Sequence, residues 1–178
     1  MARKAAAKPF TVRVTHLEMV SPPVKRAAMP SRPRLALMRA PHIPLAFYRY
    51  LYEQVGKPHH WMVRREMADA ELTAILHAET AEIQVLYADG APAGFFELDL
   101  ARMPREVEIV YFGMAPEFQG LGIGKFFFSE ALDAAWAHAP ARVTLHTNTL
   151  DSPRALHIYQ KAGFSPCGYS QETVTHWL

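Results

Sequence analysis

The sequence predicts a single α/β domain with a mixed, mostly antiparallel central sheet of about six or seven strands, flanked by about four helices. Its 178 residues, half of them hydrophobic, are enough for one substantial core. Two alternating segments joined by Asp89-Gly90 predict a hairpin. Beyond this hairpin, strand-like and helix-like segments follow one another in the order β-α-β-α-β, which completes the mixed sheet.

The N-terminal segments predict two strands and a connecting loop. Residues 1–9 are expected to form a flexible basic tail, and residues 10–178 the domain. The alternation from Phe10 to Met19 predicts a strand, and Arg34 to Arg39 is a shorter strand candidate. The proline-rich stretch from Ser21 to Pro33 between them predicts a loop.

Two helices are predicted next. The stretch from Pro44 to Val55 has helical character and ends at Gly56. Asp69 is the expected N-cap of a second helix, in which Leu72 and Leu76 belong to an apolar stripe.

The rest of the chain supplies most of the predicted sheet. The expected strands are Ala81–Tyr87, Ala93–Leu100, Glu106–Met114 and Arg142–Thr147, followed by a final hairpin over Phe164–Leu178. One helix is predicted from Gly124 to about His138. Another is predicted with Ser152 as its N-cap and Gly163 as its stop signal.

Composition excludes several classes of function. The net charge of +2 does not favour nucleic-acid binding, and no apolar run is long enough to span a membrane. The single cysteine, Cys167, excludes an internal disulfide and fits a reducing compartment, so we expect a cytoplasmic protein. His59 and His60 lack further ligands at metal spacing, and no metal site is expected.

The segment from Met114 to Lys125 is the strongest functional signal. Gly120, Gly122 and Gly124 alternate between a predicted strand and the start of a helix. Glycines leave the backbone amides open, and the first amides of a helix are unpaired at the positive end of its dipole. The junction therefore predicts a site for a phosphate-like anion. Its spacing fits neither a P-loop nor a dinucleotide fingerprint.

Two motifs resemble the GNAT acetyltransferase superfamily. The pattern Gln-x-x-Gly-x-Gly at Gln119 to Gly124 resembles the acyl-CoA loop of that family. The segment from Ser152 to Phe164 resembles its Asn-x-x-Ala-x-x-x-Tyr-x-x-x-Gly-Phe motif, with serine in place of asparagine. The resemblance covers about residues 83–164, the coenzyme-binding core. It implies a GNAT-like fold, splayed at the acyl-CoA site, that transfers an acetyl group from acetyl-CoA directly to an amine in a ternary complex.

The resemblance also implies roles for individual residues. Glu108 is the first candidate for the base and Tyr159 for the acid, since a phenol stays protonated at neutral pH. Glu106 or a bridging water remains an alternative to Glu108. Strand periodicity places Val110 and Phe112 on the face of Glu108. The implied coenzyme contacts are Phe112, Gly113, Met114, Gln119, Gly120, Leu121, Gly122, Ile123, Gly124, Lys125, Asn148 and Ser152.

Further expectations concern the coenzyme arm, the acceptor and other functions. A bulge that splays the strands would be tolerated at Gly113, and Asn148 lies four residues before the position of the family's asparagine. One alternative is a module that binds or senses acyl-CoA without turnover. Another is an enzyme that acetylates protein lysines or N-termini rather than a metabolite. A homodimer is compatible with the resemblance.

Overall fold

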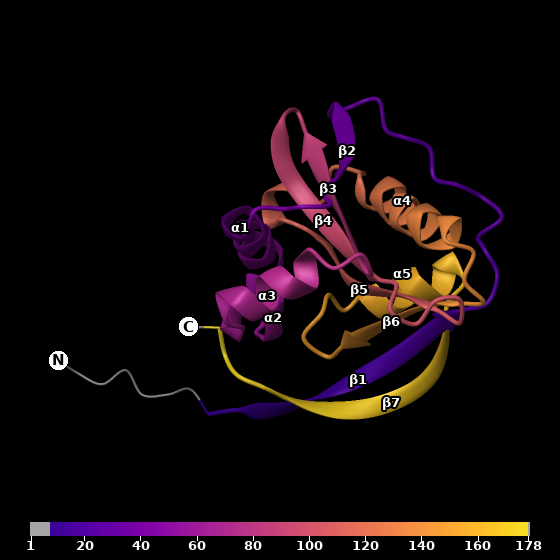
Figure 1. Cartoon of the computed structure of the whole chain (residues 1–178). Helices are drawn as coiled ribbons and strands as arrows, with labels where there is room; N and C mark the ends of the chain where they lie inside the picture. Colours follow the sequence, from indigo (N-terminus) through magenta and orange to yellow (C-terminus); the bar gives the residue numbers. More distant parts are fainter. Residues whose placement is uncertain (1–7, 178) are drawn as a thin grey trace.

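The computed structural model describes residues 8–177 and shows an open, twisted sheet with helices on both faces (Figure 1). Except for Lys8 and Pro9, the predicted basic tail lies outside the described residues. Within this range, every helix is too short or too polar to cross a membrane.

The order of elements confirms the predicted α/β class. The strands are β1 (Phe10–Met19), β2 (Leu35–Arg39), β3 (Ala81–Ala88), β4 (Ala91–Asp99), β5 (Val107–Met114), β6 (Val143–Asn148) and β7 (Ser165–Val174). The helices are α1 (Leu45–Gly56), α2 (Val63–Glu66), α3 (Asp69–Leu76), α4 (Gly124–Ala137) and α5 (Ala155–Ala162). Two short 3₁₀ turns are η1 (Lys57–His59) and η2 (Pro116–Phe118).

The seven strands of the described sheet lie in the order β2-β3-β4-β5-β6-β1-β7. All neighbours are antiparallel except β5 and β6, which pair in parallel only over Val107–Ile109 and Val143–Leu145. Beyond Ile109 and Leu145 these two strands separate. The sheet is thus splayed at its centre, as predicted.

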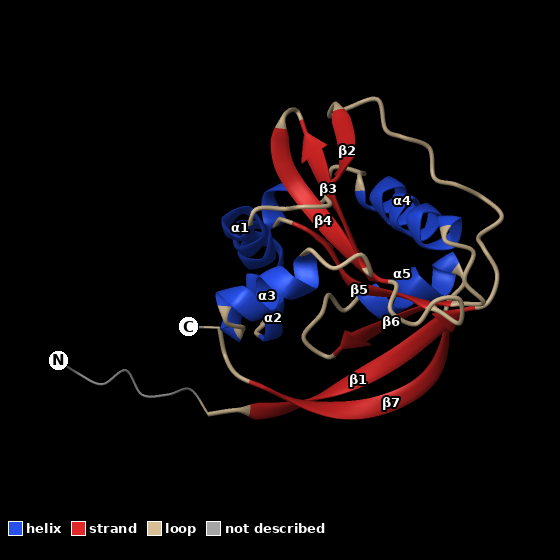
Figure 2. Cartoon of the chain, viewed as in Figure 1, coloured by secondary structure: helices blue, strands red, loops and turns tan. Residues whose placement is uncertain are grey.

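Each face of the sheet carries its own hydrophobic core. On one face, α4 buries Phe127, Ala131 and Ala135 against the sheet, and α5 packs beside it (Figure 2). On the other face, Leu51 and Val55 of α1 and Leu72 and Leu76 of α3 cover β3 and β4. Apolar side chains at helical spacing therefore hold the helices on both sides of the splayed strands.

Three local predictions were wrong. Residues after Phe164 form one long strand, β7, whose partner is the N-terminal strand β1 rather than a second arm of a hairpin. The helix α3 begins at Asp69, but Ala68 is its N-cap, and the Asp69 carboxylate accepts a hydrogen bond from Arg49 instead. Ser152 is also not an N-cap, because α5 starts at Ala155 and the Ser152 hydroxyl accepts from the amide of Arg154 at 3.3 Å.

A buried polar network fixes α1 and α2 to the sheet. The side chain of Glu97 in β4 is 3% exposed and accepts hydrogen bonds from the Tyr48 hydroxyl at 2.5 Å and from Arg64 Nη2 at 2.6 Å. Burial raises the pKa of Tyr48 well above its usual value, and the adjacent Glu97 charge raises it further. Each partner therefore satisfies a group that would otherwise be unpaired inside the protein.

Replacing Glu97 with glutamine is expected to lower the free energy of unfolding by about 3 kcal/mol or more, because Arg64 would stay charged and buried without its counter-ion. The measurement is a urea unfolding curve followed by tryptophan fluorescence. Asp133→Asn, which removes the more exposed ion pair with Arg26, is the control and should change stability by less than about 1 kcal/mol. Equal losses in both variants would contradict the importance of the buried pair.

Candidate active site

The junction between β5 and α4 has the open backbone that the sequence predicts. Gly120 and Gly122 have φ angles of +78° and +76°, and an added Cβ at either position would meet no atom within 4 Å. In the described part of the chain, no backbone amide from Gly120 to Phe126 donates to a protein acceptor. These amides lie at the N-terminus of α4, where the helix dipole favours an anion.

The side chains of this loop have different positions. Ile123 is fully buried and anchors the loop in the core, whereas Leu121 and Lys125 are exposed. Gln119 donates from Nε2 to the Met114 carbonyl at 3.0 Å, so it ties the loop to the end of β5. The exposed ammonium of Lys125 has no ion-pair partner among the described residues. The loop is therefore held by Gln119 and Ile123, and its amides stay accessible.

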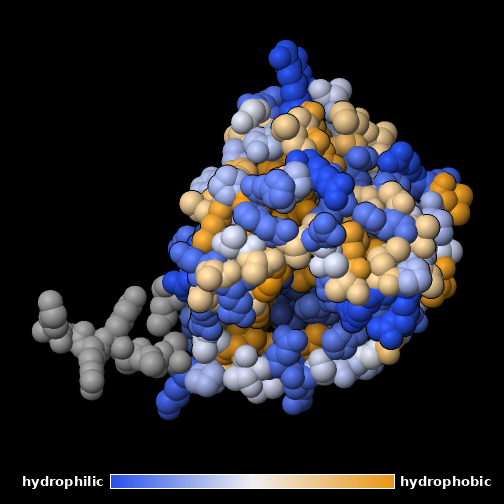
Figure 3. Space-filling model, in the orientation of Figure 1, coloured by the Kyte–Doolittle hydropathy of each residue, from blue (hydrophilic) through white to orange (hydrophobic). Residues whose placement is uncertain are grey.

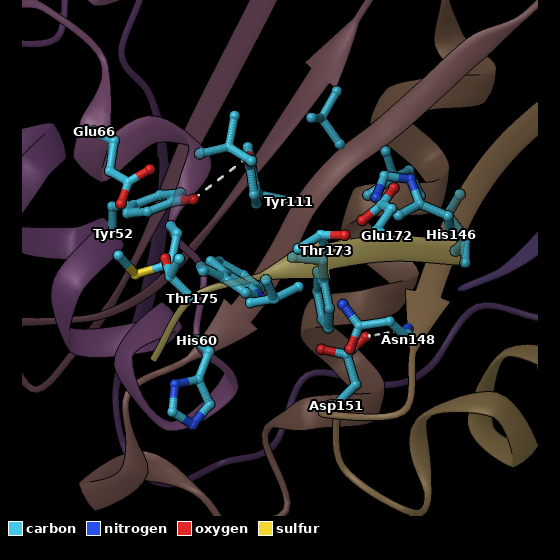
Figure 4. A pocket seen from close by; sticks show the side chains of 18 of the residues that line it. Tyr52, His60, Glu66, Tyr111, His146, Asn148, Asp151, Glu172, Thr173 and Thr175 are labelled. Carbon is cyan, nitrogen blue, oxygen red and sulfur yellow. Dashed lines mark hydrogen bonds between the residues drawn. The ribbon is translucent and has the colours of Figure 1, made fainter. Parts of the chain in front are cut away.

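A cavity of about 260 Å³ opens where β5 and β6 separate (Figure 4). Its wall combines side chains from α1, α2, β5, β6, α5 and β7. Figure 3 shows the surface hollowed on the face above β1 and β7, with apolar and polar residues around the hollow. The cavity thus reaches from the splayed strands to the side of the sheet covered by α1 and α2.

Tyr159 lies in this wall, on α5. Its ring packs against Phe128 and Phe164, with centroid distances of 5.3 Å and 6.3 Å. Its hydroxyl makes no hydrogen bond to the described residues. Burial raises the pKa of Tyr159, so the phenol stays protonated at neutral pH. The position offers a proton donor to a group bound in the cavity.

Glu108 is held by charged neighbours and is not itself part of the cavity wall. It forms an ion pair with Arg102 and a hydrogen bond with His146 Nδ1, the latter at 3.2 Å. The hydrogen bond from His146 lowers the pKa of Glu108, and the same bond raises the pKa of His146. It is the imidazole of His146, on β6, that lines the cavity. The pair therefore presents a carboxylate-supported histidine to the site.

A bulge sets the faces of β5. Val110 has no partner on β4, because Glu97 pairs with Tyr111 and Leu98 with Ile109. The bulge lies three residues before Gly113, where a bulge was expected. It turns Phe112 toward α4, where its ring meets Phe127 and Phe128 at 4.9 Å and 5.0 Å. The expectation that Phe112 shares the face of Glu108 was therefore wrong.

Aromatic side chains form the cavity wall on the side of α1. The rings of Tyr52 and Trp61 lie 5.1 Å and 4.9 Å from the ring of Tyr111, measured between centroids. The Tyr52 hydroxyl accepts a hydrogen bond from the amide of Arg64 at 3.2 Å. Burial raises the pKa of Tyr52 and of Tyr111, so both phenols stay neutral. The three rings form an apolar wall. The Tyr52 hydroxyl faces both the Arg64 amide and the Tyr111 hydroxyl.

Comparison with known families decides the classification. The sequence model of the acetyltransferase (GNAT) family matches residues 46–164, more than half of the chain. The chain belongs to the GNAT acetyltransferase family. A comparison with curated protein sequences found no match.

Solved structures with the GNAT fold resemble this one. A tandem GNAT protein from the clavulanic acid biosynthesis pathway has a TM-score of 0.64 at 16% identity, covering 94% of this chain and 55% of that one. A GNAT-family acetyltransferase from Novosphingobium aromaticivorans, described as putative in its name, has 0.63 at 14%, covering 99% and 70%. An aminoglycoside acetyltransferase from a soil metagenome has 0.59 at 14%, covering 73% and 91%.

At these identities the likeness shows the fold alone. Moreover, for six of the solved structures that match, including the first two described above, this chain spans only 53% to 70% of the other protein's length. The activity and substrates of those proteins therefore do not transfer to this GNAT domain.

The GNAT fold brings some predicted site residues together and leaves others apart. Asn148 and Tyr159 share the cavity wall with residues of β5, and the glycine loop follows the end of that strand. Ser152 is exposed and outside the wall. Glu106 is also outside it, because its buried carboxylate is bound by Arg102 at 2.7 Å and by Arg142 at 2.5 Å. Of the two candidates for the base, only Glu108 is linked to the cavity, through His146.

The sequence reasoning missed His146, Glu66 and Glu172, which all line the cavity of this GNAT domain. His146 alternates with the core residue Leu145 in β6, and this period-two pattern would place it on the face opposite α4. No local signal marks Glu66 or Glu172, because the cavity brings together segments that are distant in the sequence.

Proposed function

We propose that the chain is an acetyl-CoA-dependent N-acetyltransferase that transfers the acetyl group directly to an amine in a ternary complex. The observation that carries this proposal is the run of unpaired amides from Gly120 to Phe126, which follows β5, the strand that lines a cavity together with Tyr159. The GNAT family uses acetyl-CoA as donor. The cytoplasm, which supplies acetyl-CoA and suits the single cysteine, is the proposed location.

The open backbone can bind the two ends of the coenzyme. The unpaired amides of the glycine loop, together with Lys125, match a diphosphate. Beyond Ile109, the edge of β5 toward β6 has no strand partner, so an extended pantetheine arm can pair with residues 110–114 as an added strand. Asn148 lies on the opposite side of the splay, at the end of β6.

The chemistry requires two proton movements. The amine nitrogen bonds to the thioester carbonyl carbon, and the carbon–sulfur bond breaks. One proton leaves the amine, and one proton is taken up by the departing thiolate. We assign donation to the thiolate to Tyr159, whose phenol is protonated and has no protein hydrogen-bond acceptor in the described chain.

We assign acceptance of the amine proton to His146, positioned by Glu108. In this arrangement Nδ1–H of His146 donates to the Glu108 carboxylate, and Nε2 is left as the acceptor. The lowered pKa of Glu108 makes its carboxylate a weak base. The hydrogen bond to this carboxylate raises the pKa of His146, so the imidazole is the stronger base of the two. The predicted base Glu108 thus takes part through His146.

Gly122→Val is expected to abolish acetyl-CoA binding, because the branched side chain would occupy the space in front of the open amides. The measurement is isothermal titration calorimetry with acetyl-CoA. Gly90→Val is the matched control: Gly90 also has a positive φ, +86°, and open space around it, but lies in the β3–β4 turn. It should show a similar loss of stability and normal affinity. Normal affinity of a folded Gly122→Val protein would contradict the proposed diphosphate site.

Tyr159→Phe is expected to lower kcat by at least about tenfold with little change in acetyl-CoA affinity, because the thiolate would lose its proton donor. The measurement is the release of free thiol in the presence of an amine panel. Tyr169→Phe, at a tyrosine on β7 that is 68% exposed, is the control and should retain full activity. Unchanged turnover in Tyr159→Phe would remove this residue from the mechanism.

The pH profile of kcat/KM is expected to depend on Glu108 and His146. Activity should fall as the pH drops through the raised pKa of His146, because the protonated imidazole cannot accept a proton. Glu108→Gln removes the largest cause of that raised pKa, so this limb should move to lower pH. His146→Gln should remove this limb. His138→Gln is the control, because the His138 imidazole is also paired with a carboxylate, that of Glu82, but lies outside the cavity wall. Identical profiles for all four proteins, measured with one amine, would refute the assignment.

The same assays separate the alternatives. A sensing module would bind acetyl-CoA with normal affinity but release no thiol with any amine. A protein acetyltransferase would release thiol with lysine peptides and not with small amines.

A further inference from the structure

The wall of the cavity is acidic. Glu66, Asp151 and Glu172 line it, and no lysine or arginine does so among the described residues. Asp151 is engaged locally, since its carboxylate accepts hydrogen bonds from the Thr147 hydroxyl at 2.6 Å and the Asn148 amide at 3.0 Å. Glu66 and Glu172 have no ion-pair partner in the described chain. Two carboxylates are therefore available to a bound molecule.

The two available carboxylates lie in different parts of the cavity (Figure 4). Glu66 is at the end of α2, beside the ring of Tyr52. Glu172 is on β7, close to His146, and its charge contributes to the raised pKa of that imidazole. Aromatic faces next to a carboxylate favour a cation, because the ring face and the carboxylate both attract positive charge.

The position of α2 is set by a buried ion pair and by hydrogen bonds from Arg49 to the backbone carbonyls of Arg64, Arg65 and Met67. Arg64, in the same helix as Glu66, is fixed by its ion pair with Glu97, and the amide of Arg64 donates to the Tyr52 hydroxyl. The charge of Arg64 is thus paired inside the protein. The guanidinium of Arg65 lies over the ring of Trp177, 4.2 Å from its centroid. Neither belongs to the cavity wall.

We propose that the acceptor is a small amine that carries a second positively charged group. The reacting amine lies by His146 and Glu172, within reach of the thioester near Tyr159. The second cation lies by Glu66 and the ring of Tyr52. The volume of about 260 Å³ is below the usual range for drug-sized ligands, which limits the acceptor to a short chain.

The same charges disfavour other amines. An amine that carries a carboxylate or phosphate would bring like charges next to Glu66 or Glu172, with no lysine or arginine in the wall to compensate. A monoamine of equal length would leave Glu66 without a partner. The inference rests on the proposed function, because it concerns the acceptor of that reaction.

The test compares three acceptors of matched length: 1,5-diaminopentane, pentylamine and 5-aminopentanoate. With the wild-type chain and acetyl-CoA, kcat/KM from thiol release should be highest for the diamine. The value for pentylamine should be lower by about fivefold or more, and the value for 5-aminopentanoate should be the lowest. The preference for the diamine should decrease as salt is added, because ionic strength screens the pairing with exposed carboxylates.

Variants locate the preference. Glu66→Gln should bring the diamine and pentylamine to similar kcat/KM values, and Glu66→Lys should favour 5-aminopentanoate over the diamine. Both should bind acetyl-CoA with wild-type affinity in calorimetry. Glu53→Gln, at an exposed carboxylate of α1 outside the cavity wall, is the matched control and should keep the wild-type order.

The outcomes separate this inference from the proposed function. Equal use of 5-aminopentanoate and the diamine would overturn the inference, as would a diamine preference that survives Glu66→Gln. Normal acetyl-CoA binding with no acetylation of any of the three amines would overturn it too, while leaving the transferase proposal in place for larger acceptors. Absence of acetyl-CoA binding to the wild-type chain would overturn both.

Discussion

The pair formed by Arg64 and Glu97 connects the sheet to the segment that walls the cavity. The helix α2 has only the four residues Val63–Glu66 and buries a single one of them, Arg64, so apolar packing cannot fix its position. A charged side chain that is 10% exposed needs a partner, and Glu97 in the central strand β4 provides it. Tyr48 occupies the second carboxylate oxygen, which brings α1 into the same network. One buried carboxylate therefore connects both helices that contribute Tyr52 and Glu66 to the cavity wall.

The splay of β5 and β6 has a separate cause. The pairing of these parallel strands stops after Ile109, and the bulge at Val110 then turns Tyr111 toward the network and Phe112 toward α4. An added Cβ at Gly113 would approach Val55 of α1 to 2.4 Å, so this glycine permits the close approach of the helix. The edge of β5 is thereby left without a protein partner between two well-packed cores, where a ligand can complete the sheet.

The sequence predicted the backbone geometry of the glycine loop better than the wall of the cavity. Loop glycines at Gly120 and Gly122 act through local backbone geometry, and their spacing is visible in the chain itself. Glu97 and Glu108, by contrast, are both carboxylates on strands, and only long-range partners distinguish a buried structural group from one linked to the cavity. The bulge at Val110 shifts the period-two pattern by one residue, so the face of Phe112 could not be read from alternation. The strand β1, near the start of the chain, lies between β6 and β7, which come from its last third. No local sequence pattern predicts such a long-range pairing.

The glycine loop was more predictable than the cavity wall because the two are built from different parts of the chain. In the proposed function, coenzyme binding would depend on backbone amides, which every residue carries, so a few glycines and a helix start would define it. The proposed acceptor site is a cavity lined by side chains from α1, α2, β6 and β7, which are distant from one another in the sequence. The network at Glu97 holds α1 and α2, whereas β1 holds β6 and β7 together through its pairing with both. A change in either support can therefore alter the cavity wall while the glycine loop, fixed by Gln119 and Ile123, keeps its shape. In the proposed enzyme, donor binding and acceptor choice would thus be set by different parts of one sheet, which meet where β5 and β6 separate.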